Sequence, residues 1–298
     1  MGKLGFKKDN SVVDELVALY YSIMQEMKSG YLNFRDRASR VSDLIFRSDQ
    51  HGIYFYRRIL DSANPRTHIY NDQFEFDRDV ISLASNDYLN FSQHPEVIAE
   101  SIRITQEYGI GSGSVPMLAG TMKIHKILEQ KLTSFLGYEA CLLFSSGYIA
   151  NYGVFSALLN SGDVAILDTS VHASIIDGCQ NADSLYFIHN DMESLERTLI
   201  KAQNFANKLI VVDGVYSMDG DLAKMDQILE LANKYDANVA VDDAHGIGVM
   251  GDYGKGTQHH FNLHAGADLV TGSFGKALAG VGGFVCGRRE WIRYFELL

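Results

Sequence analysis

The chain has 298 residues, of which 46% are hydrophobic and 21% charged, as expected of a globular protein with a sizeable core. Its 26 basic and 37 acidic residues give a formal net charge of −11, which argues against nucleic acid or an anionic membrane as the main partner. Cys141, Cys179 and Cys286 are scattered without metal-binding spacing, so we expect no metal site and a reduced, cytoplasmic setting. We find neither a signal peptide nor an apolar run that could form a transmembrane segment.

The first part of the chain favours helix. Apolar residues recur at helical spacing between about residues 10 and 50. A polar stretch that begins near Pro65 separates this segment from the rest. We interpret residues 1–75 as a partly helical N-terminal extension and residues 76–298 as one large domain. The recurring apolar residues include Leu16, Leu19, Tyr20 and Ile23.

From about residue 80, short apolar runs alternate with amphipathic segments. Nearly continuous apolar strands separated by helices indicate an α/β fold, with a mostly parallel sheet covered by helices. Ligands of such sheets bind at the carboxyl ends of the strands. The expected strands are residues 80–85, 140–146, 164–168, 184–188, 209–215, 238–243, 268–274 and 282–287, and the clearest helices are 94–108 and 123–136.

Two segments late in the chain carry the most distinctive chemistry. Asp242 ends an apolar run in VDDAHGIGV, and Lys276 follows 34 residues later (276 − 242) in TGSFGKALAG. A lysine amine can form a Schiff base with the aldehyde of pyridoxal phosphate (PLP), and an aspartate can keep the pyridine nitrogen protonated. Order, spacing and flanking residues together predict a PLP site. Taken singly, Lys276 could be a solvated surface lysine and Asp242 a helix cap.

The sequence also indicates a phosphate-binding site. Ser146, Gly147 and Tyr148 follow an expected strand and open a helix, where backbone N–H groups form a cradle for an anion. Ser273, three residues before Lys276, offers another hydroxyl. Many turns between a strand and a helix contain Ser-Gly, so this pattern is weak when taken alone.

Two histidines and a serine are ambiguous from the residues alone. His245 could hydrogen-bond a phenolic oxygen of the cofactor or transfer a proton. His172 could stack on a flat ring, and Ser217 could contact the cofactor. The competing interpretations are a loop histidine, a histidine at a helix start and a serine that caps a turn.

From about Ile81 to its end, the chain resembles the α-oxoamine synthases, PLP enzymes of fold type I. The resemblance implies the large domain of that fold, with a mostly parallel sheet of the seven-stranded type. The segments that carry it run in the family's order: SNDYLNF, YGIGSGS with AGT, LFSSGYIAN, DTSVHASIIDG, HND, GVYSMDGD, VDDAHGIGVMG and GSFGKALAGVGGF.

The resemblance also implies roles for individual residues. Lys276 would be the Schiff-base lysine, Asp242 the partner of the pyridine nitrogen and His172 the ring stacked on the cofactor. His245 and Ser217 would hydrogen-bond the oxygen of the cofactor ring. The residues implied near the phosphate are Gly147, Tyr148 and Ser273, next to Ser146.

The implied reaction is the decarboxylative condensation of an amino acid with an acyl-CoA thioester, which yields an α-amino ketone. Asn86, in SNDYL, would lie near the carboxylate of the amino acid, and Lys276 would remove its α-proton. The implied partners are these two substrates and a second copy of the chain, because the family forms homodimers with sites at the interface.

Two features depart from the family pattern. The family continues beyond the position of Leu298 with a C-terminal domain whose arginine binds the substrate carboxylate, so we expect that small domain to be absent here. The segment GSGSVPMLAGT lacks the arginine that members using small amino acids often carry near Pro116. This favours a long-chain-acyl or pimeloyl-type condensation, as in serine palmitoyltransferase or 8-amino-7-oxononanoate synthase.

Two alternatives stay open. The chain could be another fold type I enzyme, such as an aminotransferase or a lyase, although the ordered synthase motifs argue against this. It could also be a non-catalytic subunit or a fragment of such an enzyme. Loss of the cofactor lysine is the usual sign of a non-catalytic subunit, and Lys276 is present.

Overall fold

The computed structural model describes residues 10–28, 30, 32–51, 59–70, 78–263 and 266–297. The chain divides into two compact units: unit 1 comprises Met1–Asp61 and His68–Val80, and unit 2 comprises Ser62–Thr67 and Ile81–Leu298. Within the described ranges, no helix is long and apolar enough to cross a membrane.

Unit 1 contains α1 (Asn10–Lys28) and α2 (Phe34–Gln50), which confirms the helical pattern of this segment. The helices pack through Leu16 and Ile23 of α1 and Leu44 of α2. The side chain of Asn33 caps α2, because its oxygen accepts the N–H of Asp36 at 2.9 Å.

A small sheet precedes the large domain. Within residues 59–70 and 78–81 the structure has three strands in the order β1 (Ile59–Leu60), β2 (Arg66–Tyr70) and β3 (Arg78–Ile81). The predicted strand over residues 80–85 is wrong beyond Ile81. The N–H of Ser82 donates instead to the carbonyl oxygen of Pro65, and Leu83 is 93% exposed, so no strand or core holds this segment extended.

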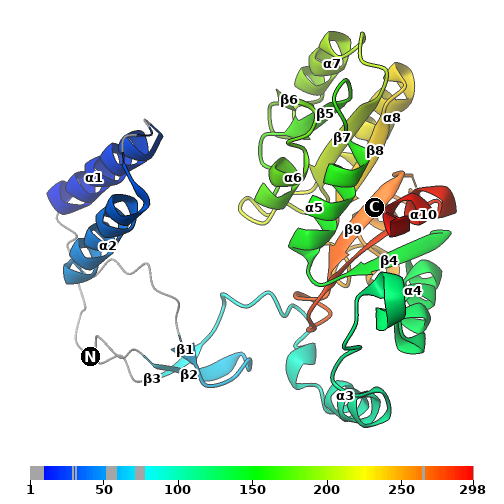
Figure 1. Ribbon diagram of the computed structural model, residues 1–298, viewed down its shortest axis with the longest axis horizontal. Helices are drawn as coiled ribbons and strands as arrows, with labels where there is room; N and C mark the ends of the chain where they lie inside the picture. Colours follow the sequence, from blue (N-terminus) through cyan, green and yellow to red (C-terminus); the bar gives the residue numbers. More distant parts are fainter. Residues whose placement is uncertain are drawn as a thin grey trace. The chain divides into compact units, whose positions relative to one another are not determined.

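The main sheet forms the centre of unit 2 (Figure 1). Over residues 78–263 and 266–297 its seven strands lie in the order β4-β10-β9-β8-β7-β5-β6. Strands β5 to β9 run parallel to one another, whereas β10 runs antiparallel to β9 and β4. The predicted mostly parallel sheet is therefore confirmed. The strands are β4 (Ala140–Phe144), β5 (Val164–Asp168), β6 (Asp183–Phe187), β7 (Lys208–Asp213), β8 (Asn238–Asp242), β9 (Leu269–Ser273) and β10 (Gly283–Gly287).

Helices cover both faces of this sheet. Side chains alternate along each strand, so Val164 and Ile166 of β5 face one layer while Ala165 and Leu167 face the other. One layer contains α4 (Lys123–Leu136), α7 (Met192–Lys201) and α8 (Met225–Tyr235). The other contains α5 (Gly147–Leu158), α6 (Ala173–Gly178) and α10 (Arg289–Leu297). The elements outside the layers are η1 (Phe91–Gln93), α3 (Pro95–Tyr108), η2 (Pro116–Gly120), η3 (Asp252–Gly254) and α9 (Thr257–His260).

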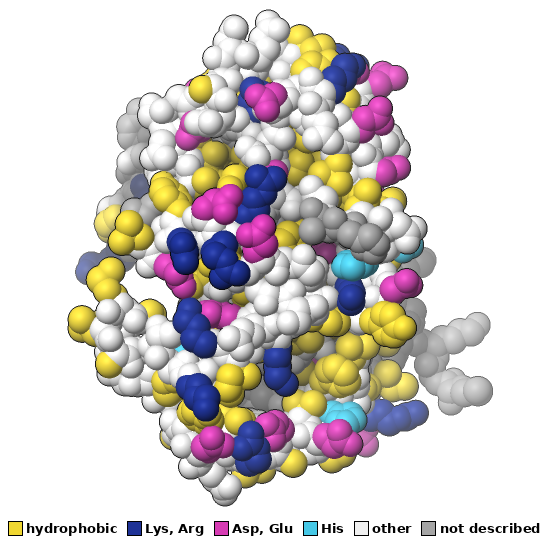
Figure 2. Space-filling view, turned by 90° about the vertical axis from the view of Figure 1, so that its right-hand side faces the viewer, with side chains coloured by type: hydrophobic (Ala, Val, Ile, Leu, Met, Phe, Trp, Pro, Cys, Tyr) yellow, Lys and Arg dark blue, Asp and Glu magenta, His cyan; other side chains and the backbone are white. Residues whose placement is uncertain are grey.

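Figure 2 views the side of unit 2 that carries α4 and α10, where basic and acidic side chains are interspersed. Nζ of Lys126 lies 2.9 Å from Oε2 of Glu129 in the same helix, and 3.2 Å from Oε1 of Glu296 in α10. The exposed pair with Glu296 contributes little stability, about 0–1 kcal/mol. Burial of the strands is therefore what holds the domain together.

The order of the strands places polar residues along one edge. Four neighbouring parallel strands end in a polar side chain: β5 at Asp168, β7 at Asp213, β8 at Asp242 and β9 at Ser273. Their carboxyl ends lie at the same edge of the sheet, where ligands of α/β sheets bind.

Candidate active site

Lys276 lies at this edge, on the loop between β9 and β10, and is half-buried. The loop turns tightly: Ala279 has a φ of 54°, and its N–H donates to the carbonyl oxygen of Lys276 at 2.9 Å. Burial lowers the pKa of the Lys276 ammonium, against the opposing charges of Asp242 and Asp213. The amine is therefore more readily deprotonated and more nucleophilic than a surface lysine.

The carboxylate of Asp242 is held by two neutral donors. Its Oδ2 accepts Nδ2 of Asn151 at 2.6 Å, and its Oδ1 accepts the N–H of Ala244 at 3.0 Å. The orientation of the Asn151 amide is fixed in turn, because its oxygen accepts the hydroxyl of Thr271 at 2.6 Å. These contacts stabilise a negative charge at a defined position.

His172 is joined to the same network. It caps the N-terminus of α6, and its Nδ1 lies 2.6 Å from the hydroxyl oxygen of Ser174. That oxygen also accepts Nδ2 of Asn151 at 2.9 Å. The backbone of His172 is also held, because its N–H donates to Oδ1 of Asp213 at 3.3 Å. His172 remains exposed, so its ring is available for a flat ligand.

His245 lies close enough to Lys276 and Asp242 to respond to their charges. Burial, followed by the charge of Lys276, lowers the pKa of His245 to about 4, so the ring is neutral at neutral pH. Its Nδ1 is 2.6 Å from the hydroxyl of Tyr88, which donates more weakly to Oδ1 of Asn86 at 3.4 Å. The SNDYL segment is thereby brought to the site.

Asp213 is a second carboxyl group beside Asp242, its register partner across β7 and β8. Burial, together with the charge of Asp242, raises the pKa of Asp213 to about 8. Asp213 therefore holds a proton more readily than an exposed aspartate does. Asp242, with its two hydrogen-bond donors, is the better placed of the two carboxyl groups to pair with a cation bound at the edge of the sheet.

The N-terminus of α5 meets the end of β9 at close range. Ser146 caps the helix by accepting the N–H of Ile149 at 3.1 Å. A Cβ atom on Gly147 would lie 2.8 Å from Cβ of Ser273, so only glycine allows this approach. The helix N–H groups and the Ser273 hydroxyl are thereby brought to one place, where they form a set of donors suited to an anion. Tyr148 lies beside it, with its ring edge-on to that of His172 at 6.0 Å and its hydroxyl bonded to Asp177.

The structure brings most of the predicted residues together. The exception is Ser217, which is exposed on the loop after β7; in the part of the chain that is described, no hydrogen bond joins it to the other predicted residues. Sequence analysis missed the partners that hold the site. They are Tyr88, Asn151, Ser174, Asp213 and Thr271.

A family model described as aminotransferase class I and II matches residues 78–298. The chain belongs to this family. The predicted resemblance is confirmed by 44% identity over 249 residues to 8-amino-7-oxononanoate synthase of Thermoanaerobacter pseudethanolicus, covering 82% of this chain and 62% of the relative. Identity to 8-amino-7-oxononanoate synthase 1 of Bacillus subtilis is 46% over 219 residues, covering 73% and 56%. The chain thus spans less than two thirds of the length of these relatives.

Solved structures of the family have the same fold. Serine palmitoyltransferase of Sphingomonas wittichii matches with a TM-score of 0.76 and 35% identity, over 82% of this chain and 60% of that one. Serine palmitoyltransferase of S. paucimobilis, solved with PLP and myriocin bound, matches with a TM-score of 0.83 and 31% identity, over 89% and 67%. The predicted fold class, PLP-dependent fold type I, is confirmed.

Proposed function

We propose that this chain forms the PLP-binding part of an acyltransferase that condenses an amino acid with an acyl-CoA and releases carbon dioxide. The observation that carries the proposal is the position of Lys276. It lies close enough to Asp242 to respond to its charge, and it follows the end of β9, where Ser273 meets the N-terminus of α5. In this proposal residues 76–298 are the PLP-binding domain and residues 1–75 an extension. The family match from residue 78 supports that boundary.

The residues present fit PLP. Gly147, Tyr148 and Ser273, beside the capping Ser146, would hold the phosphate, because the close approach of Gly147 to Ser273 brings the helix N–H groups and the Ser273 hydroxyl together. Lys276 would hold the aldehyde carbon covalently.

Around the ring, Asp242 would keep the pyridine nitrogen protonated and His172 would lie against the ring face. When bound, PLP supplies a sink for the electron pair left on the α-carbon of an amino acid. Ser217 is the weakest of the proposed contacts, since the structure gives it no partner among the described site residues.

In this proposal, residues at the carboxyl-terminal edge of the sheet transfer the protons. The lowered pKa of Lys276 suits an amine that takes the α-proton of the substrate. His245 is neutral, and because Tyr88 occupies its Nδ1, Nε2 is the nitrogen left to bond the oxygen of the cofactor ring. Asn86, next to this pair, would bind the substrate carboxylate.

The proposed substrates follow from the relatives. Those named 8-amino-7-oxononanoate synthase and serine palmitoyltransferase support an amino acid and a pimeloyl or long-chain acyl thioester. We also propose that the enzyme works as a cytoplasmic homodimer. Several large apolar side chains of unit 2 are exposed as a partner surface would require: Met117 at 78%, Leu118 at 82% and Val281 at 92%.

The test is an absorbance spectrum of the full chain with added PLP, compared with Lys276→Ala. We expect a visible band that borohydride abolishes in the wild type and that is absent from the variant. Amino acids and acyl-CoAs are then screened for α-amino ketone formation. Keto acid formation without acyl-CoA would indicate an aminotransferase instead, and no band in either protein would indicate a non-catalytic subunit or fragment.

A further inference from the structure

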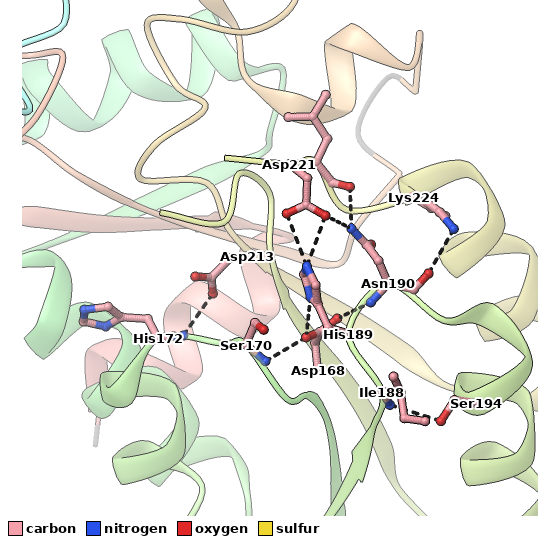
Figure 3. A network of polar contacts seen from close by, with 11 residues as sticks. Asp168, Ser170, His172, Ile188, His189, Asn190, Ser194, Asp213, Asp221 and Lys224 are labelled. Atoms are coloured by element: carbon pink, nitrogen blue, oxygen red, sulfur yellow. Dashed lines mark hydrogen bonds and ion pairs between the residues drawn. The ribbon is translucent and has the colours of Figure 1, made fainter. Parts of the chain in front are cut away.

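His189 lies just after β6 and bonds a carboxylate with each ring nitrogen (Figure 3). Its Nδ1 is 2.9 Å from Oδ1 of Asp168, and its Nε2 is 3.1 Å from Oδ2 of Asp221. A neutral imidazole has a single N–H, so donation to both carboxylates requires the imidazolium. Burial opposes that charge, but the bonds and charges of Asp168 and Asp221 outweigh it and raise the pKa of His189.

The two carboxylates belong to different loops at the edge that carries the site. Asp168 ends β5 and accepts the N–H of Ser170 at 2.8 Å, so it shapes the loop that leads to His172. Asp221 lies on the loop between β7 and α8, which also carries Ser217. A charged ring between these carboxylates therefore links the loops of His172 and Ser217.

Tyr216 extends this link towards the site. Its ring packs edge-on against that of His189, with the ring centroids 4.4 Å apart, and its side chain is fully buried. Its N–H donates to the carbonyl oxygen of Asp221 at 3.0 Å. Because Ser217 is the next residue, the packing of Tyr216 against His189 constrains the backbone that carries Ser217.

Asn190 reinforces the same arrangement. Its N–H donates to Oδ2 of Asp168 at 3.0 Å, and its Nδ2 donates to Oδ2 of Asp221 at 2.6 Å. A φ of 51° allows the chain to turn so that both donors converge on the carboxylates. Nζ of Lys224 donates to the carbonyl oxygen of Asn190 at 3.0 Å (Figure 3).

The cluster does not match a metal site. Both nitrogens of His189 face carboxylates, which leaves neither lone pair for a metal ion. Over the ranges that the structure describes, no three or more His, Cys, Asp or Glu side chains are grouped to hold one. The network is therefore a charged link between loops.

We propose that His189 is a positioning residue of the PLP site: held between Asp168 and Asp221, it fixes the loops that present His172 and Ser217 to the cofactor. The inference rests on the proposed function, because those two side chains have a role only if the site takes PLP. His189 acts through the loops and does not itself touch the cofactor.

The test compares His189→Gln with the matched control Lys224→Met. Glutamine has one donor end and one acceptor end, so it can serve one carboxylate but not both. The control removes a charged contact to the same loop and leaves both bonds of His189 intact. Because residues that orient a ligand-binding group change affinity about 10–100-fold in metal sites, we expect His189→Gln to raise the dissociation constant for PLP on the order of tenfold and Lys224→Met to leave it unchanged.

A second measurement needs no cofactor. Histidine-selective 15N NMR at neutral pH is expected to show a ring with both nitrogens protonated, a signal that His189→Gln removes. The groups that face this ring are Asp168, Asp221, Tyr216 and, through Asn190, Lys224. We expect the ring signals of His172 to move in His189→Gln but not in Lys224→Met.

The outcomes separate the two proposals. If the wild type binds PLP and His189→Gln binds it equally, with unmoved His172 signals, the positioning role is overturned while the proposed function stands. If the wild type binds no PLP, both fail. Should His189→Gln not fold, Asp221→Ala replaces it, because Asp221 is 44% exposed and its loss leaves the bond to Asp168. The same weakening of PLP binding is then required.

Discussion

At the scale of single residues, the site depends on buried polar groups that satisfy one another. Asn151 uses both amide hydrogens and its oxygen, which bind Asp242, Ser174 and Thr271. Asn151 and Thr271 are only 2% and 1% exposed. A buried donor or acceptor that loses its partner costs about 1–3 kcal/mol, so these side chains are coupled.

We therefore expect Asn151→Ala to lower the free energy of unfolding by about 1–3 kcal/mol, because it leaves the Thr271 hydroxyl without its acceptor. Thr271→Val should recover part of this loss when it is added to Asn151→Ala, since it removes the stranded hydroxyl. Urea denaturation of the two single variants and the double variant measures the coupling. Strictly additive losses would contradict the network.

Asp243 predicts a pH dependence of stability. Its carboxyl is buried and accepts the N–H and hydroxyl of Thr257 at 2.8 and 2.6 Å. Burial raises its pKa from 3.8 to about 7. Between these values the folded chain binds more protons than the unfolded chain, so this group's stabilising contribution is full below pH 3.8 and is lost as the pH rises through 7.

Asp243→Asn is expected to remove this component, because an amide does not titrate. The free energy of unfolding of the wild type, minus that of the variant, should fall as the pH rises from about 4 to about 7 and then level off. Denaturation at a series of pH values measures the difference. Parallel curves for the two proteins would refute the assignment.

At the scale of elements, Gly147 joins α5 to β9. In Gly147→Ala the new Cβ would meet Cβ of Ser273 at 2.8 Å and force the start of the helix away from the strand. We expect PLP affinity to fall about tenfold or more, by analogy with other displaced ligand-orienting groups. Gly111→Ala is the control, because no atom lies within 4 Å of its added Cβ. Equal PLP affinity in both variants would exclude α5 as the phosphate cradle.

Sequence patterns predicted the boundaries of helices and strands correctly where an apolar run ends in turn residues. β5 and β8 were predicted almost to the residue because their side chains are buried on both faces of the sheet. The segment after Ile81 failed because two apolar residues suggested a strand, whereas strand pairing depends on neighbours that the local sequence does not contain.

The same limit separates the site residues that the local sequence predicts from those that it does not. Lys276 and Asp242 could be recognised because the residues that flank each of them in the sequence indicate its role. Asn151 and Tyr88 could not, because their partners Asp242 and His245 lie 91 and 157 residues away in the chain. Asp213 did carry a legible signal: like Asp242, it is an aspartate at the end of a buried strand.

At the scale of the whole molecule, unit 2 exposes several apolar residues to water, which is energetically unfavourable. Leu118 at 82% and Val281 at 92% exposure would leave hydrocarbon in water in an isolated chain. A second copy of the chain would cover them, as the proposed homodimer requires. We therefore expect the wild type to sediment as a dimer.

The double variant Leu118→Lys, Val281→Lys should shift this equilibrium to monomer, because like charges buried in an interface repel one another and have no partner of opposite charge. Ile200→Lys is the matched control: this residue of α7 is 47% exposed and lies in a different element. Sedimentation velocity over a range of concentrations distinguishes the states. A dimer that survives the double variant would place the interface elsewhere, and a wild type that stays monomeric at every concentration would remove the homodimer from the proposal. Loss of PLP binding together with dissociation would indicate that the second copy completes the site.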